Sequence, residues 1–189
     1  MQILCVKTNS LPLEWTQKTR ALCADVFSHV RDADIHWIER GHAENDETYR
    51  QIIPYIVIMD TAGKFLCYPR HGNEARLHGF YSCGIGGHID IPDKHETFSQ
   101  TVYAGLAREL SEELANFSQD SLLLEYRGII NDIDSPVSRV HFGLVFLGRC
   151  AEGYLPAPSA ELSGARWLSR KELEGQKKEA WSKLALELI

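Results

Sequence analysis

The chain has 189 residues, of which 44% are hydrophobic and 24% charged, and its 20 Lys and Arg against 26 Asp and Glu give a formal net charge of −6. Such a chain can bury the core of one globular domain without disulfides, so an intrinsically disordered protein is excluded. An acidic protein has little attraction for nucleic acid polymers or anionic membranes, and we expect neither as a partner.

The cysteines and the N-terminal residues indicate in which cellular compartment the protein is expected. Five cysteines without a Cys-x-x-Cys pair fit neither a disulfide framework nor a zinc knuckle. The N-terminus lacks the basic stretch of a signal peptide, and no run approaches the ~18 apolar residues of a membrane helix. These features predict a cytoplasmic protein.

The first half of the chain begins with apolar residues at helical spacing, which predict a helix over about residues 13–30. A mostly polar connection with one short strand near 35–38 follows. Two β-branched and aromatic runs, 55–59 and 64–68, flank the turn sequence Asp60-Thr-Ala-Gly63 and predict a hairpin.

The second half carries the clearest helical pattern, a stripe of apolar residues four positions apart. The stripe consists of Phe98, Val102, Leu106, Leu110 and Leu114. It predicts a helix over 98–114. Strands are predicted at 126–130, 140–147 and 165–168, and a last helix at 170–189. This order of elements indicates a mixed sheet packed between helices.

The same central helix carries three carboxylates in the sequence Arg108-Glu-Leu-Ser-Glu-Glu-Leu114. Glu109, Glu112 and Glu113 are spaced by three and four residues, so they share one face of the helix. Like charges at this spacing repel, and a bound divalent cation would reverse that effect. A solvated acidic face is the alternative interpretation of these residues alone.

A glycine-rich turn, Gly84-Ile-Gly-Gly-His-Ile-Asp90, precedes this helix and lets backbone atoms approach a ligand closely. Gly87 together with Arg108-Glu-Leu-Ser-Glu-Glu resembles the Nudix box, Gly-x5-Glu-x7-Arg-Glu-U-x-Glu-Glu-x-Gly-U, where U is apolar. The resemblance implies an α/β/α sandwich with a mixed β-sheet and a catalytic helix. It also implies hydrolysis of a nucleoside diphosphate linked to another group, with Mg²⁺ or Mn²⁺ as cofactor.

The sequence departs from the box in three places. Gly87 and Arg108 are 21 positions apart, whereas the box places them 14 apart. The first box glutamate falls on Gln100, although Glu96 could approach if the loop folds inward. Ala115-Asn116 replaces the closing Gly-U of the box. The longer loop is similar to that of a subgroup of Nudix phosphoesterases.

The resemblance implies a role for each box residue. Glu109, Glu112 and Glu113 would hold the metal with the carbonyl of Gly86, and Arg108 would orient a box glutamate by a charge-assisted hydrogen bond. A surface pair with Glu112 is the alternative role for Arg108. The general base stays open between a box glutamate and an acid on another loop, for which the candidates are Glu152 and Glu161.

Basic residues gather in the sequence before the box and are the expected contact for an anionic substrate. They are Arg70, His71, Arg76, His78 and His88. We assign Arg70, Arg76 and His88 to substrate binding, with ordinary loop solubility as the alternative. The residues between Gly87 and Arg108, polar over 88–96 and without periodicity, are expected to form a lid that does not hold the fold together.

These features predict a metal-dependent hydrolase that cleaves a phosphoanhydride bond in a small-molecule substrate. A Nudix-fold module that binds a nucleotide without turnover is the alternative function, and a homodimer is left open. The resemblance extends over 51–174, which we expect to form the Nudix-like domain. Residues 1–50 would be an N-terminal extension packed on it, and 175–189 a C-terminal helix.

Overall fold

A central β-sheet runs through the computed structural model, which describes residues 1–70 and 78–189. The strands are β1 (Gln2–Lys7), β2 (Arg20–Leu22), β3 (Ile35–Glu39), β4 (Tyr49–Met59), β5 (Phe65–Pro69), β6 (Tyr81–Ser82), β7 (Ile85–Gly86), β8 (Leu122–Asn131), β9 (His141–Cys150) and β10 (Arg166–Leu168). The main path follows the order β10-β5-β4-β9-β8-β2. The β4–β9 pair is parallel and the other named pairs are antiparallel, so the sheet is mixed, as predicted.

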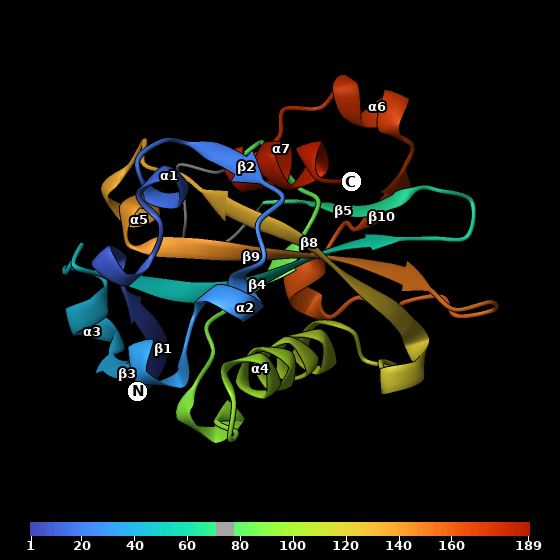
Figure 1. Ribbon diagram of the computed structural model, residues 1–189. Helices are drawn as coiled ribbons and strands as arrows, with labels where there is room; N and C mark the ends of the chain where they lie inside the picture. Colours follow the sequence, from blue (N-terminus) through green and yellow to red (C-terminus); the bar gives the residue numbers. More distant parts are fainter. Residues whose placement is uncertain (71–77) are drawn as a thin grey trace.

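Helices cover both faces of this sheet (Figure 1). They are α1 (Leu13–Thr16), α2 (Val26–His29), α3 (Arg40–Ala43), α4 (Phe98–Glu113), α5 (Pro136–Arg139), α6 (Arg170–Glu174) and α7 (Ala180–Glu187). One apolar cluster joins α4 to one face of β4, and a second joins α7 to the other face. The predicted α/β/α sandwich is confirmed. In the described ranges no helix is both long and apolar enough to cross a bilayer.

The helix predicted over 98–114 is confirmed as α4. Thr97 caps its N-terminus, where the Thr97 side-chain oxygen accepts a hydrogen bond from the Gln100 amide. The Gln100 side-chain oxygen in turn accepts a hydrogen bond from the Thr97 amide. Val102, Leu106 and Leu110 are fully buried beneath the sheet. The predicted strands and the hairpin are also present, in β3, β4, β5, β8, β9 and β10.

The helix predicted over 13–30 is wrong. The apolar residues of this segment belong to α1, β2 and α2, and they reach the core from three different elements. Trp15 in α1 stacks on Phe142 with 6.5 Å between ring centroids, while Leu22 in β2 pairs with Ile129 on β8. Strand pairing and tertiary packing therefore override a spacing that only imitates a helix.

The helix predicted over 170–189 is interrupted. Gly175 ends α6, and the backbone then runs beside Tyr81 before α7 begins. The Tyr81 amide donates to the Lys177 carbonyl at 2.8 Å, and the Glu179 amide donates to the Tyr81 carbonyl at 3.1 Å. Tyr81 of β6 thus bonds to backbone groups of Lys177 and Glu179 that a continuous helix would need for its own hydrogen bonds.

One edge of β4 is shared by three short strands, which fixes the position of the glycine-rich turn. β1 pairs with the start of β4, β7 with its middle and β5 with its end. The turn therefore begins on the central strand, with Gly86 opposite Tyr55. Residues 1–50 contribute β1, β2 and β3 to the sheet, and the division of the chain at 50 and 174 stays a prediction.

The expectation that 88–96 is a lid without a structural role is wrong. Ile89 is fully buried in the cluster beneath the sheet, and its carbonyl accepts a hydrogen bond from the Leu4 amide at 2.8 Å. Asp93 is 5% exposed. Gly105 of α4 leaves room for both, because a Cβ there would lie 2.8 Å from Ile89 and 3.3 Å from Asp93. The segment is packed between β1 and α4.

Truncating Ile89 to alanine should therefore destabilise the protein by about 3 kcal/mol, since it removes a buried side chain and leaves a cavity. Urea unfolding measures this change. Ile91, which is 41% exposed in the same segment, provides the control, and Ile91→Ala should change the free energy of unfolding by less than about 0.5 kcal/mol. Equal effects of the two substitutions would show that the segment is not packed.

Candidate active site

The glycine-rich turn and α4 meet at Gly87 and Glu109. A Cβ placed on Gly87 would lie 2.1 Å from the Cδ of Glu109, so the Glu109 carboxylate rests directly on the backbone of Gly87. The neighbouring Gly86, on β7, is exposed. The absence of side chains from the turn thus allows a carboxylate and the backbone that carries the Gly86 carbonyl to come close together.

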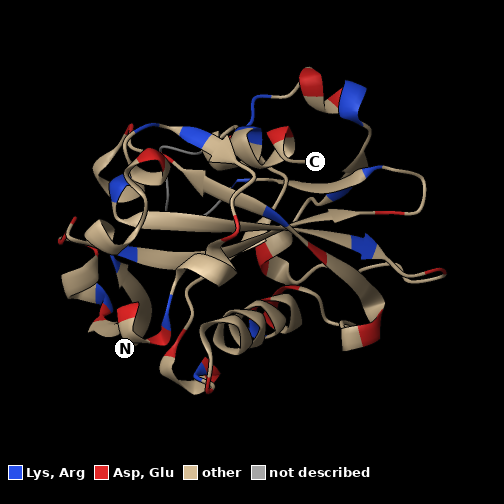
Figure 2. Cartoon of the chain, viewed as in Figure 1, with Lys and Arg blue, Asp and Glu red and all other residues tan. Residues whose placement is uncertain are grey.

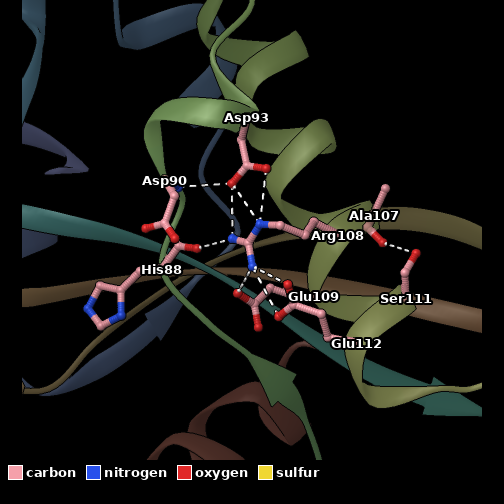
Figure 3. Close-up of polar contacts among 8 residues, drawn as sticks. All are labelled: His88, Asp90, Asp93, Ala107, Arg108, Glu109, Ser111 and Glu112. Atoms are coloured by element: carbon pink, nitrogen blue, oxygen red, sulfur yellow. Dashed lines mark hydrogen bonds and ion pairs between the residues drawn. The ribbon is translucent and has the colours of Figure 1, made fainter. Parts of the chain in front are cut away.

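Arg108 is held at the centre of a polar cluster (Figure 3). Its Nη1 donates to Glu109 Oε1 at 2.8 Å and to both carboxylate oxygens of Glu112 at 3.2 Å. Its Nη2 donates to the His88 carbonyl at 2.6 Å. Burial lowers the pKa of the Arg108 guanidinium, but its contacts with Asp93 and Glu109 outweigh this effect and raise the pKa. Arg108 therefore remains charged and joins the turn to the helix.

Asp93 supplies the other side of this cluster and was not among the expected site residues. Both of its carboxylate oxygens accept from Arg108 Nε at 3.1 Å, and Oδ2 also accepts from Nη2 at 3.0 Å. The Asp90 amide donates to the same oxygen at 2.9 Å. Asp93 therefore takes the position of the first box acid, for which Glu96 was the candidate. The Gln100 side chain instead contacts Thr97 at the start of α4.

The three box glutamates lie in different surroundings. Glu109 is largely buried, and burial raises its pKa against the opposing effect of Arg108. The Glu112 side chain is 58% exposed. Glu113 accepts a hydrogen bond from Ser159 Oγ at 2.8 Å, and burial raises its pKa as well. Glu109 and Glu112 therefore share Arg108, whereas Glu113 is directed to another loop.

The donor set fits a hard divalent cation with few protein ligands. Within residues 1–70 and 78–189, no three His, Cys, Asp or Glu side chains gather as a metal-binding group. Glu109 and Glu112 nevertheless both contact one cationic nitrogen, Arg108 Nη1, so two carboxylates can face a common positive partner. Mg²⁺ commonly uses one or two carboxylates and completes its shell with water and substrate phosphates. The role of the three glutamates as ligands stays a prediction.

A pocket of about 360 Å³ borders the same turn on the α7 side of the sheet. Gly86, Gly87 and His88 contribute to its wall, together with Arg70 and Trp181. The turn thus has the acidic end of α4 on one side and a cavity on the other. In Figure 2 acidic residues gather along the later turns of α4.

The residues assigned to substrate binding differ in their placement. Arg70 lines the pocket, with its Nε 3.6 Å from Glu179 Oε2. His88 also lines it, but burial and the nearby charge of Arg40 lower the His88 pKa to about 3, so the ring is neutral at pH 7 and its Nε2 lies 2.7 Å from Gln51 Oε1. Arg76 lies outside the described residues. Arg70 is therefore the described candidate that carries a positive charge at pH 7, and the Glu179 carboxylate lies beside it.

Glu179 is a buried carboxylate in the pocket wall that the sequence did not single out. Its Oε1 accepts from Ser82 Oγ at 2.7 Å and from the Tyr55 hydroxyl at 3.1 Å. Ser182 Oγ lies 3.3 Å from the same oxygen. These contacts tie α7 to β4 and β6 directly before the glycine-rich turn.

Replacing Arg108 by lysine should lower kcat/KM about tenfold, because one ammonium cannot reach Asp93, Glu109 and the His88 carbonyl together. Steady-state kinetics on any substrate found would measure this. Arg31, which pairs with Asp34 on the surface, supplies the matched control, and Arg31→Lys should leave the rate unchanged. Parent-level activity in Arg108→Lys would favour the simple surface pair with Glu112.

Comparisons with known proteins show which proteins this chain is similar to. Protein YmaB of Bacillus subtilis (strain 168) is 28% identical over 190 residues, which cover 97% of this chain and 91% of YmaB. Tm1382, assigned as a Nudix hydrolase, has a crystal structure that matches with a TM-score of 0.79 at 33% identity, covering 100% of this chain and 98% of that one. DR0079 from Deinococcus radiodurans matches in fold, with a TM-score of 0.57 at 18% identity over 89% of this chain and 99% of that one.

A model of the NUDIX domain matches residues 40–188, most of the chain. The match includes the glycine-rich turn, α4 and the pocket-lining part of α7. It supports hydrolysis of a pyrophosphate bond in general terms. The chain therefore belongs to the Nudix family.

Proposed function

We propose that the protein hydrolyses a phosphoanhydride bond in a nucleoside diphosphate linked to another group, with Mg²⁺ or Mn²⁺ as cofactor. The observation that carries the proposal is the contact between the turn and the helix. The Glu109 carboxylate lies against Gly87 and shares Arg108 with Glu112, and the same turn borders a pocket of about 360 Å³.

In this proposal Glu109, Glu112 and Glu113 hold the metal together with the carbonyl of Gly86. The bound cation would neutralise charge on the phosphoryl oxygens and assist the leaving group. Arg108 fixes the Glu109 carboxylate by the 2.8 Å hydrogen bond, while Asp93 and the His88 carbonyl fix Arg108. The chain's own contribution is thus a set of carboxylates whose orientation is determined before substrate binds.

Glu161 is the stronger candidate for the general base among the loop acids considered. Ser159 Oγ links the segment that contains Glu161 to the box. This oxygen donates to Glu113 and accepts from the Glu161 amide at 3.2 Å. The proximity of Glu161 also contributes to the raised pKa of Glu113. Nothing comparable joins Glu152 to the box within the described part of the chain.

Arg70 would bind an anionic part of the substrate, because it lines the pocket. Arg76 is also proposed to bind substrate, on the basis of the sequence alone. We expect the partner to be a small molecule. A homodimer stays a prediction.

A substrate screen with and without metal tests the function. Nucleotide sugars, dinucleoside polyphosphates, dinucleotides and oxidised nucleotides would be incubated with the protein in Mg²⁺ or Mn²⁺, and phosphate-containing products measured. We expect turnover of at least one class, its loss with EDTA and its return with excess metal. Tight binding of a nucleotide without turnover in any metal would favour the sensor function instead.

A further inference from the structure

Two cysteines face each other across the hairpin formed by β5 and β6. The strands are antiparallel, with Tyr68 opposite Ser82 and Pro69 opposite Tyr81. Continuing this register by one residue places Cys67 opposite Cys83. Both side chains are fully buried, and both belong to the apolar cluster on the α7 face of the sheet.

The hydrogen bonds of the hairpin define the geometry of this pair. The Arg70 amide donates to the Phe80 carbonyl at 2.8 Å, which marks 70 and 80 as a hydrogen-bonded pair. Hydrogen-bonded and non-hydrogen-bonded pairs alternate along an antiparallel ladder. The register therefore places 67 and 83 at a non-hydrogen-bonded position, one residue beyond the last pair of the ladder. Cα atoms in such pairs are about 4.5 Å apart. This separation lies within the range of about 4.4 to 6.8 Å that a disulfide spans.

The two thiols have different acidities, which suits them to react with each other. A hydrogen bond from the Cys67 thiol lowers the pKa of Cys83, and the charge of Lys178 acts in the same direction. The same hydrogen bond raises the pKa of Cys67. Cys83 is therefore the better nucleophile of the pair, and Cys67 is placed to react with it in a second step.

We propose that Cys67 and Cys83 form an oxidisable dithiol, whose disulfide ties β5 to the segment that enters the glycine-rich turn. With hydrogen peroxide as oxidant, the Cys83 thiol loses its proton and the thiolate attacks one peroxide oxygen. The O–O bond breaks, and the leaving hydroxide takes up the proton, which gives a Cys83 sulfenic acid and one water. The Cys67 sulfur then attacks the Cys83 sulfur, and the sulfenic hydroxyl leaves with the Cys67 thiol proton as a second water. Two thiols are oxidised to one disulfide, and one peroxide is reduced to two waters.

The position of the pair connects this chemistry to the site. Ser82 precedes Cys83, and its Oγ donates to Glu179 and lies 2.9 Å from the Gly84 carbonyl oxygen. Tyr68 follows Cys67, and its hydroxyl donates to the same carbonyl at 3.1 Å. Among the described residues, two residue pairs join β5 to β6, so a disulfide would add a covalent tie beside the pocket wall.

The remaining cysteines provide internal controls. Cys23 is exposed, Cys5 is buried in β1, and Cys150 is buried at the end of β9. The intact, reduced protein would be treated with hydrogen peroxide, its remaining thiols alkylated under denaturing conditions, and the peptides identified by mass spectrometry. Oxidation of Cys23 in the same sample shows that the reagent acted.

We expect a Cys67–Cys83 linked peptide, a loss of about 2 Da for the two hydrogens removed, and full reversal by dithiothreitol. Cys67→Ala and Cys83→Ala should each prevent the internal disulfide, whereas Cys150→Ala should retain it. If Cys67 and Cys83 remain alkylatable while Cys23 is oxidised, or if either pairs with another cysteine, the proposal is overturned. The mapping uses the parent protein, so it decides the question even if a variant fails to fold.

Discussion

Replacing Gly87 by alanine is expected to lower kcat/KM by about 100-fold with little change in stability. The new Cβ would occupy the space of the Glu109 carboxylate, whose atoms lie 2.1 and 2.2 Å from that position. The carboxylate is the end of a flexible side chain, so it can move away without disturbing the core. Its contact with Arg108 and its orientation toward a metal would be lost.

Glu109→Gln should show a similar loss, since the amide keeps the shape of the side chain but removes the negative charge. Gly41→Ala is the matched control, because a Cβ on Gly41 meets nothing within 4 Å. Kinetics, Mn²⁺ titration and thermal unfolding of all three variants measure the effect. Parent-level activity in Gly87→Ala would contradict the placement of Glu109 at the reacting centre.

Replacing Asp93 by asparagine should reduce both stability and activity. The Asp93 carboxylate is 6% exposed and the Arg108 side chain 27% exposed, so the pair is mostly shielded from water. Removing one partner of a buried ion pair costs about 3 to 5 kcal/mol, and we expect about 3 because Arg108 keeps its contacts with Glu109 and His88. A roughly tenfold fall in kcat should accompany it, since Arg108 would no longer be fixed.

The readouts of Asp93→Asn separate positioning from general destabilisation. Activity would be measured well below the unfolding midpoint, where the variant is folded, and the Mn²⁺ affinity in the same buffer. Asp34→Asn supplies the control, because its pair with Arg31 lies on the surface and should be worth less than about 1 kcal/mol. A fall in stability with unchanged kcat and metal affinity would make Asp93 purely structural.

The elements around the site could be predicted from the sequence because their signals are local. The apolar stripe from Phe98 to Leu110 has one period, and Thr97 caps the helix, so α4 is specified by its own residues. The turn at Asp60-Thr-Ala-Gly63 similarly specifies the β4–β5 hairpin, with Gly63 at a φ of 76°. Long, regular segments of this kind need little information from the rest of the chain.

The segments that were predicted wrongly depend on distant partners. Residues 13–30 are divided because Leu22 pairs with β8, and 170–189 is divided because Lys177 and Glu179 bond to Tyr81. Neither partner is near in sequence. Apolar spacing records which residues are buried, but it does not record which element buries them.

The candidate site shows the same division. Arg108 and Glu109 could be assigned from the motif, whereas Glu179 could not, because it acts through contacts formed only in the folded chain. Asp93 could also have been found, because it lies six positions after Gly87, the spacing that the box gives its first acid. Counting back from Arg108 reaches Gln100 instead, since the seven extra residues lie between Asp93 and Arg108.

The parallel pairing of β4 with β9 also affects how the chain folds. Residue 51 pairs with residue 141, so the central strand receives its main partner only after most of the chain has been made. At about 5 to 20 residues per second, synthesis of the intervening segment takes roughly 5 to 20 s. During this time the apolar run from Ile52 to Ile58, which is buried in the native protein, has no strand on its β9 edge. Pairing over this separation is expected to slow folding, because the intervening chain must close into a loop before the contacts between β4 and β9 can form.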